Sequence, residues 1–223
     1  MTSAAVRVRP PVESDAPRLA DIHISAWRAA YRKVMSDEYL DGLNPEPQTR
    51  GWRRNITEPR PGTFHLVAET DSGVAGFCIF GPAEGAAESD SESASASATG
   101  QLYAINVHPD SWAQGVGSAL FAAAEEKLLS LGYTRAFLWV EASNKRAIDF
   151  YTRRGWLDDG GTLQDTRFDP PVSERRHSRD LLSEVASVSF NHLDFATAAT
   201  RRRGPGATEQ PPPDGADGGQ AEP

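Results

Sequence analysis

"QLYAINVHPDSWAQGVGSALFAAAEEKLLSLGYTRAFLWVEASNKRAIDFYTRRGW", residues 101–156, decides the fold. Residues 101–108 have the pattern of a strand, and a glycine-paired turn then opens a helix that Gly132 ends in the left-handed conformation. Residues 135–142 predict a second strand and residues 144–156 a short second helix. Two strands joined by a helix should be parallel, with that helix across one face of the sheet.

The sequence on either side of this stretch adds antiparallel strands. Further strands are predicted at 6–11, 63–69, 74–81 and 173–182. The segment "TDSG" joins the second and third of these as a hairpin. Ser14 or Asp15 is expected to cap a first helix that carries Pro17 in its first turn. The predicted fold class is therefore mixed α/β, with one parallel βαβ unit in a mostly antiparallel sheet and flanking helices.

Composition limits the class of protein. The chain has 223 residues, one cysteine and no apolar run near the roughly 18 residues that span a bilayer. Its beginning lacks the apolar core of a signal peptide, so we expect a cytoplasmic protein. The net charge of −8 is concentrated in residues 84–92 and 184–223, which leaves the remainder almost neutral. The overall charge therefore does not predict a cationic partner.

Two segments lack residues that could form a core. Residues 82–100 are small, polar and acidic, and residues 201–223 are rich in proline and glycine, so both are expected to be disordered, which makes the tail over residues 183–223 largely disordered. We therefore expect one domain over residues 1–182, followed by a tail. The triplet Arg201–Arg203 in this tail is interpreted as a solvated run, and neither a nucleic acid nor a membrane is expected as a partner.

The glycine turn has two interpretations. A helix N-terminus presents unpaired N–H groups and the positive end of the helix dipole, which favours an anion such as phosphate. A tight strand-to-helix connection would use the same glycines. A Walker A loop is absent, and Leu120 stands where the dinucleotide fingerprint requires a third glycine. The turn alone leaves both interpretations open.

The segments "INVHP", "QGVGSAL", "LWVEASN" and "NKRAIDFYTRRGW" together resemble the GCN5-related N-acetyltransferase (GNAT) superfamily over about residues 6–182. The resemblance implies an N-acetyltransferase that transfers an acetyl group from acetyl-CoA, its cosubstrate, directly to a primary amine of an acceptor. It implies no metal, and it is compatible with a homodimer. The alternative function is a non-catalytic acyl-CoA-binding sensor or scaffold.

The resemblance also assigns cofactor-binding residues. The family pattern [QR]-x-x-G-x-[GA] matches here except that Trp112 stands at the Gln/Arg position. Backbone amides are expected to bind the cofactor diphosphate at Gln114, Gly115, Val116, Gly117 and Ser118. Gln114 is the candidate for the missing side-chain contact. Trp112 is expected either to pack near the cofactor or to serve as ordinary filler.

Four further residues match the family. The backbone of Ile105 and Val107 would hydrogen-bond the pantetheine arm, and the Val107 N–H would face the thioester oxygen. Strand packing explains both residues equally well. Asn144 is expected to contact the cofactor arm or, alternatively, to cap a helix. Tyr151 is expected to be the general acid that protonates the CoA thiolate or, alternatively, an aromatic anchor.

The residues predict less about the acceptor. Trp139 stands where related ribosomal-protein acetyltransferases carry a glutamate, so no general base is assigned. The candidates are Glu141 first, then Glu69 and His108, and a chain of water molecules is the alternative. An aromatic wall for the acceptor is proposed from Trp27, Tyr31, Tyr39 and Trp52, although core packing explains Trp27 and Tyr31 equally well. The lone cysteine, Cys78, lies inside a strand and is expected to be a buried structural thiol.

Overall fold

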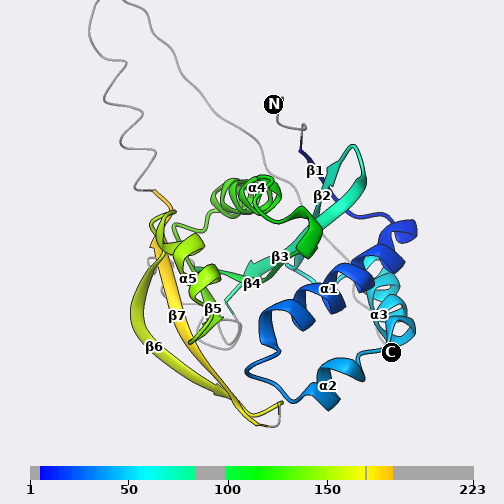
Figure 1. Ribbon diagram of the computed structural model, residues 1–223. Coiled ribbons are helices and arrows are strands. Elements are labelled where there is room, and N and C mark those ends of the chain that lie inside the picture. Colours follow the sequence, from blue (N-terminus) through cyan, green and yellow to red (C-terminus); the bar gives the residue numbers. More distant parts are fainter. Residues whose placement is uncertain (1–5, 84–98, 169, 183–223) are drawn as a thin grey trace, which may run out of the picture.

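The computed structural model describes residues 6–83, 99–168 and 170–182 and contains one seven-stranded mixed sheet (Figure 1). The strands are β1 (Arg7–Arg9), β2 (Phe64–Thr70), β3 (Gly73–Pro82), β4 (Thr99–Val107), β5 (Arg135–Glu141), β6 (Leu157–Asp165) and β7 (Val172–Asp180), in the order β1-β2-β3-β4-β5-β7-β6. The helices are α1 (Ala16–Tyr31), α2 (Asp37–Asp41), α3 (Pro45–Thr57), α4 (Val116–Ser130) and α5 (Lys145–Thr152). The pair β4–β5 is parallel and its neighbours are antiparallel, which confirms the predicted fold class.

The helices cover both faces of the sheet, with α4 and α5 on one side and α1 and α3 on the other (Figure 1). On the first side Phe121 of α4 packs against Tyr151 and Trp156, and on the second Trp52 of α3 packs against Phe77 of β3. Burial of these apolar side chains from water drives the packing of the helices on the sheet. Among the described residues, no helix is long and apolar enough to cross a membrane.

The boundaries of the segment at 82–100 differ from the prediction of disorder. Pro82 ends β3, and Thr99 and Gly100 begin β4. Gly100 lies where helix α4 meets the sheet, because a Cβ added there would be 2.7 Å from Cδ2 of Leu128. Small residues carry no apolar signal in a sequence, so this close approach was not predicted. Residues 84–98 and 183–223, the rest of the two segments predicted to be disordered, lie outside the described residues.

The strand β6 and the helices α2 and α3 were missed. Most of β6 is exposed and its sequence holds three aspartates and two glycines, so it shows no alternation of apolar side chains. It pairs with β7 in an antiparallel ladder, and ion pairs such as Asp158–Arg175 at 2.9 Å and Asp159–Arg176 at 3.0 Å add to that pairing. The helix predicted at 144–156 is shorter than expected, since Gly155 has a φ of 76° and turns the chain out of α5.

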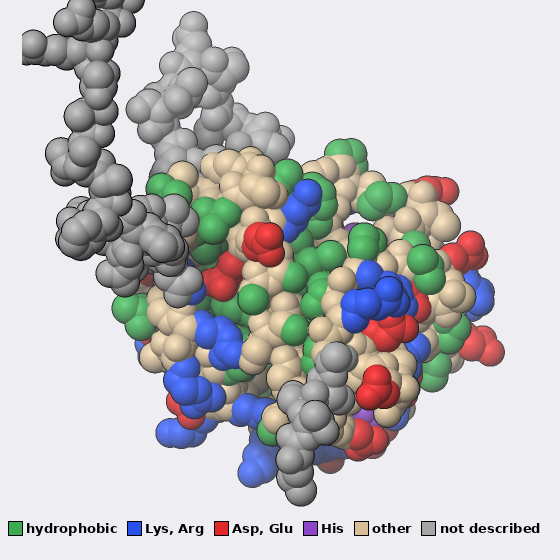
Figure 2. All heavy atoms as spheres, turned by 90° about the horizontal axis from the view of Figure 1, so that it is seen from above, with side chains coloured by type: hydrophobic (Ala, Val, Ile, Leu, Met, Phe, Trp, Pro, Cys, Tyr) green, Lys and Arg blue, Asp and Glu red, His purple; other side chains and the backbone are tan. Residues whose placement is uncertain are grey.

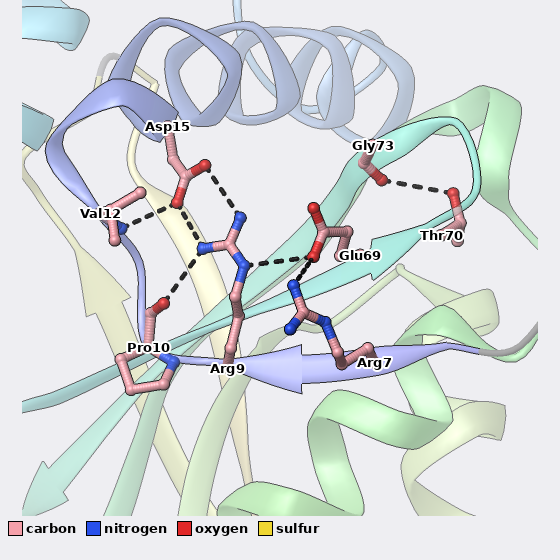
Figure 3. A network of polar contacts seen from close by, with 8 residues as sticks. All are labelled: Arg7, Arg9, Pro10, Val12, Asp15, Glu69, Thr70 and Gly73. Carbon is pink, nitrogen blue, oxygen red and sulfur yellow. Dashed lines mark hydrogen bonds and ion pairs between the residues drawn. The ribbon is translucent and has the colours of Figure 1, made fainter.

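The start of the domain is held by an ion-pair network (Figure 3). Asp15 is the first residue flanking α1, yet its side chain does not cap that helix. Its carboxylate instead accepts hydrogen bonds from Arg9 at 2.7 and 3.1 Å and from the Val12 N–H at 2.8 Å. The Arg9 hydrogen bond holds the pKa of Asp15 below its usual range. Arg9 also binds Glu69, which removes Glu69 as a free carboxylate.

Candidate active site

The parallel strands β4 and β5 separate part of the way along. They pair from Thr99–Arg135 to Leu102–Leu138, and beyond that point β4 follows β3 while β5 follows β7. We call this divergence the β4–β5 fork. At the end of β4 the His108 N–H donates to the Ala75 carbonyl at 2.9 Å.

Backbone groups alternate in direction along an antiparallel strand. Because His108 bonds to β3, its neighbour Val107 directs its N–H and C=O away from β3, toward the fork, and so does Ile105. The two residues assigned to the cofactor arm are thus both strand residues and carriers of backbone groups that β3 does not use.

The glycine turn lies between the end of β4 and the first turn of α4. Gly115 flanks the helix with a φ of 85°, and Ala113 has a φ of 61°. A non-glycine residue in this region is uncommon, so the backbone here is tightly constrained. Val116 begins the helix, and therefore the N–H groups from Gly115 to Ser118 belong to its unpaired N-terminus.

Gly117 has a different reason to be glycine. A Cβ added there would lie 3.6 Å from Phe150 and 3.6 Å from Val107, which is ordinary van der Waals contact. Glycine inside a helix costs about 1 kcal/mol relative to alanine. Neither backbone conformation nor packing within the protein therefore explains this glycine, whereas close approach of a ligand would.

The side chains of Trp112 and Gln114 are both committed. The Trp112 indole N–H donates to the Val107 carbonyl at 2.8 Å, and the guanidinium of Arg146 lies 3.5 Å from the centroid of the Trp112 ring. The Gln114 amide donates to the Asp110 carbonyl at 2.7 Å, within its own loop. Gln114 therefore uses one side-chain donor within its own loop. Trp112 is half-buried rather than part of the core, and both its N–H and its ring have partners.

One face of α5 and the residue just beyond its end lie along the glycine turn. Arg146, Phe150 and Arg154 are spaced four residues apart. Phe150 is next to Gly117, and the Arg154 guanidinium donates to the Ser118 hydroxyl and, at 3.1 Å, to the Phe150 carbonyl. The segment brings two cations and an aromatic ring to the turn.

Next to this face lies a hollow of about 500 Å³. Its lining residues are Ser118, Ala122, Glu125, Arg153, Arg154, Gly155 and Arg179. The one carboxylate in this set, Glu125, already accepts from Arg179 and from the Trp156 indole, each at 2.8 Å. Figure 2 shows Lys and Arg side chains gathered on its left, the side on which Figure 1 places α5, β6 and β7. This surface suits an anion.

Asn144 lies at the N-terminus of α5 and Tyr151 in its last turn. The Asn144 side-chain oxygen accepts the Ala147 N–H at 3.1 Å, so Asn144 caps the helix as the alternative interpretation expected. Tyr151 is 8% exposed, and its ring lies 5.7 Å from that of Phe121. Burial raises the pKa of the Tyr151 phenol well above its usual value, and the charge of Tyr31 raises it further. The phenol is therefore protonated at neutral pH.

Aromatic side chains meet where α1 and α2 approach the loop between β6 and β7. The ring of Trp27 lies 5.4 Å from Tyr31 and 5.6 Å from Phe168, and Tyr39 lies 5.7 Å from Phe168. The predicted wall is wrong for Trp52, which is 4% exposed and packs 4.6 Å from Phe77 in the core. Phe168 was missed because a lone aromatic residue in a polar loop carries no periodic signal.

Two carboxylates face this aromatic cluster. Glu141 of β5 and Glu174 of β7 are directly opposite each other in the sheet. The Glu141 carboxylate accepts the Ser143 N–H at 2.8 Å and the Ser143 hydroxyl at 2.9 Å. Burial raises the pKa of Glu174, and the nearby carboxylates of Asp165 and Glu141 raise it further. Glu174 was missed because it sits among charged residues of one exposed-looking strand.

Tyr31 of α1 lies within electrostatic reach of both carboxylates and of Tyr151. Burial raises the pKa of Tyr31 to about 12, with further contributions from Glu174 and Glu141, and Tyr31 in turn acts on Tyr151. These four groups therefore lie within electrostatic reach of one another. The other base candidate, His108, has its Nδ1 3.3 Å from the Asp110 N–H and its Nε2 3.9 Å from Asp21.

Two remaining residues, Cys78 and Trp139, are engaged in packing. Cys78 is fully buried, and burial raises the pKa of its thiol to about 12, so it is inert as a nucleophile at neutral pH. Trp139 contacts Phe137 with 6.3 Å between ring centroids and lies 5.8 Å from the Arg176 guanidinium. Neither side chain offers acid–base chemistry.

Comparison with solved structures finds the same fold. The PaiA N-acetyltransferase of Thermoplasma acidophilum, solved in complex with coenzyme A, aligns with a TM-score of 0.54 at 16% identity, over 79% of this chain and 99% of that one. The ribosomal-protein-alanine N-acetyltransferase of Brucella melitensis aligns with a TM-score of 0.55 at 19% identity, over 78% and 99% of the two chains.

Comparison of sequences identifies relatives. The uncharacterized N-acetyltransferase YuaI of Bacillus subtilis is 33% identical over 147 residues, which are 66% of this chain and 77% of YuaI. The mycothiol acetyltransferase of Clavibacter sepedonicus is 32% identical over 104 residues, 47% of this chain, and the match spans only 30% of that enzyme. The model of the acetyltransferase (GNAT) family matches residues 20–156. The chain therefore belongs to the acetyltransferase (GNAT) family and is an acyltransferase with acetyl-CoA as its cosubstrate.

Proposed function

We propose that the protein transfers the acetyl group of acetyl-CoA directly to a primary amine, without a covalent enzyme intermediate. The observation that supports this most is the β4–β5 fork, with the glycine turn following the end of β4 at the start of α4. Tyr31 and Tyr151 lie within electrostatic reach of each other and are the candidate acids. Cytoplasmic location and a homodimer stay predictions from the sequence.

The cofactor would be held mainly by backbone groups. In this proposal the N–H groups of residues 114–118 bind the diphosphate, and the dipole of α4 adds to their attraction. The pantetheine arm runs into the fork along Ile105 and Val107. The Val107 carbonyl already accepts from Trp112, so the Val107 N–H is the group proposed to meet the thioester oxygen. Asn144 contributes by fixing the start of α5.

The chemical step requires the amine to lose protons and the departing thiolate to gain one. The protonated amine first releases one proton to water, and its neutral nitrogen then attacks the thioester carbonyl. A C–N bond forms, the C–S bond breaks, and the nitrogen loses a second proton. Tyr151 donates its phenolic proton to the departing thiolate. A phenol of raised pKa is a weak acid, but the burial that raises it also raises the pKa of a thiol in the same place, so the two remain matched. The second proton of the nitrogen returns through water to the Tyr151 phenolate, and Glu174 is proposed to attract the cationic amine rather than to take its proton.

The acceptor would approach between the aromatic cluster and the carboxylate pair. Glu141 and Glu174 attract a protonated amine, and the rings of Trp27 and Phe168 offer faces to a cation or its apolar neighbour. A cationic amine is therefore the proposed acceptor class. The match to mycothiol acetyltransferase spans too little of that enzyme to carry its acceptor over.

A thiol-release assay tests this function. Acetyl-CoA is supplied with a panel of polyamines, aminoglycosides, lysine peptides and peptide N-termini, and the free CoA thiol is followed with a thiol reagent. We expect release that depends on an amine, with the acetylated amine detected by mass spectrometry. Binding of acetyl-CoA by calorimetry without release on any amine would contradict the proposal and favour an acyl-CoA sensor.

A further inference from the structure

The guanidinium of Arg146 lies on the indole ring of Trp112, 3.5 Å from the ring centroid. Trp112 comes three residues before Gly115, so the stack lies beside the glycine turn. The indole is itself anchored, since its N–H donates to the Val107 carbonyl at 2.8 Å. One ring thereby connects the end of β4, the turn and the first turn of α5.

Arg146 carries a charge that the described residues do not neutralise. Within residues 6–83, 99–168 and 170–182, no carboxylate lies within ion-pair distance of its guanidinium, whereas Arg9, Arg32 and Arg179 each have one. Arg146 is exposed overall, and the partial burial of its guanidinium lowers its pKa from the usual value, although the side chain stays charged. A cation that is held in place by a ring and has no carboxylate partner among the described residues is free to bind an anion.

The stack leaves the guanidinium able to bind oxygens. A guanidinium carries its five N–H donors in its own plane, so contact of its face with a ring does not consume them. The other polar side chains at the turn already spend donors within the protein. Gln114 donates to the Asp110 carbonyl, and Arg154, which lies on the Phe150 ring, uses two of its five N–H donors on the Ser118 hydroxyl and the Phe150 carbonyl.

We propose that Arg146 is the side chain that binds the diphosphate of acetyl-CoA, and that Trp112 is a positioning residue that holds the Arg146 guanidinium beside the turn. This inference rests on the proposed binding of the cofactor at the glycine turn. The amides of the turn are neutral donors, and Arg146 adds a full positive charge and planar pairing with phosphate oxygens. In this proposal the positive charge at the turn comes from Arg146 of α5, and Trp112 precedes the turn because its ring holds that guanidinium in place.

Calorimetric titration with acetyl-CoA tests the proposal, with Lys145→Ala as the matched control. Lys145 precedes Arg146 in the same helical turn, so this variant removes one positive charge at the same place. We expect Arg146→Ala to weaken acetyl-CoA binding about tenfold or more and Lys145→Ala to change it less than about threefold. Equal effects of the two variants would mean that only general charge matters, and would overturn the proposal.

Two further measurements separate contact from structure. Acetyl-pantetheine lacks the diphosphate, so Arg146→Ala should leave its affinity unchanged, and an equal loss for both ligands would overturn the assignment. Trp112→Ala should weaken acetyl-CoA binding, and the double variant Trp112→Arg with Arg146→Ala should restore part of it. If the unaltered protein binds acetyl-pantetheine and acetyl-CoA equally or not at all, the proposed cofactor site itself fails.

Discussion

The two sides of the candidate active site are built in different ways. The cofactor side consists of β4, the glycine turn, α4, β5 and α5, which are consecutive in the chain and offer mainly backbone groups. The acceptor side brings together α1, β5, β7 and the β6–β7 loop, and it offers side chains such as Trp27, Phe168 and Glu174. Because it uses backbone groups, the cofactor side forms a binding site whose shape depends little on side-chain identity. The acceptor side can change its specificity by substitution without altering the fold.

The largest expected effect comes from Tyr151, which lies on α5 of the cofactor side and within electrostatic reach of Tyr31 on the acceptor side. Tyr151→Phe keeps the ring and its contacts but removes the proton, so turnover should fall about 10²- to 10⁴-fold while acetyl-CoA affinity stays the same. Steady-state kinetics and calorimetry measure the two quantities. Because the pKa of Tyr151 is raised, no loss of activity from its ionisation is expected below about pH 10. Full activity of the variant would remove Tyr151 from the chemistry.

The second prediction concerns the cofactor side alone. Gly117→Val should weaken acetyl-CoA binding at least about tenfold, because a side chain would stand where the diphosphate approaches. Gly117→Ala is sharper, since its Cβ meets nothing closer than 3.6 Å in the protein. It should raise the melting temperature, as alanine favours a helix by about 1 kcal/mol, and still weaken binding. Stabilisation without weaker binding would show that the ligand does not come close to this glycine.

The third and smallest effect concerns the acceptor side. Glu174→Gln should raise the KM for a cationic acceptor about fivefold, the equivalent of about 1 kcal/mol, and leave acetyl-CoA affinity unchanged. If the variant changes only the affinity for acetyl-CoA, Glu174 belongs to the cofactor side of the site and the prediction is wrong.

The same variant should change the dependence of stability on pH. The pKa of Glu174 is raised in the folded state, so its ionisation as pH rises costs folding free energy. Thermal melts should therefore show Glu174→Gln to be more stable than the unaltered protein at pH 8, with the gain lost near pH 4. A gain in stability that is independent of pH would show that the pKa of Glu174 is not raised in the folded protein.

The same difference explains what could be predicted from the sequence. A backbone site leaves glycines at fixed spacing: Gly115 and Gly132 both adopt the positive φ that their positions suggested, and the parallel pair β4–β5 followed from strand–helix–strand order. The resemblance of these segments to a known family then supplied the cofactor. Asn144 and Trp112 needed the structure, because a sequence does not state which atom a polar group bonds.

The acceptor side was largely hidden for a physical reason. Its members come from segments far apart in the chain, and their grouping depends on register and loop geometry rather than on local pattern. Glu174 matters because β7 places it opposite Glu141, and Phe168 because its loop meets α1. Trp52 is of a residue type that is common in binding sites, but it lies in the core, because α3 packs it against Phe77.

The central claim is that backbone groups at the turn and fork hold acetyl-CoA. Nuclear magnetic resonance of the ¹⁵N-labelled protein, titrated with acetyl-CoA, tests it most directly, because each amide reports on its own surroundings. The claim predicts that the largest shifts fall on the amides of residues 114–118 and of Ile105 and Val107, while those of Trp27 and Phe168 move little. Saturable binding that leaves residues 114–118 unchanged, or no shifts at any acetyl-CoA concentration, would contradict it.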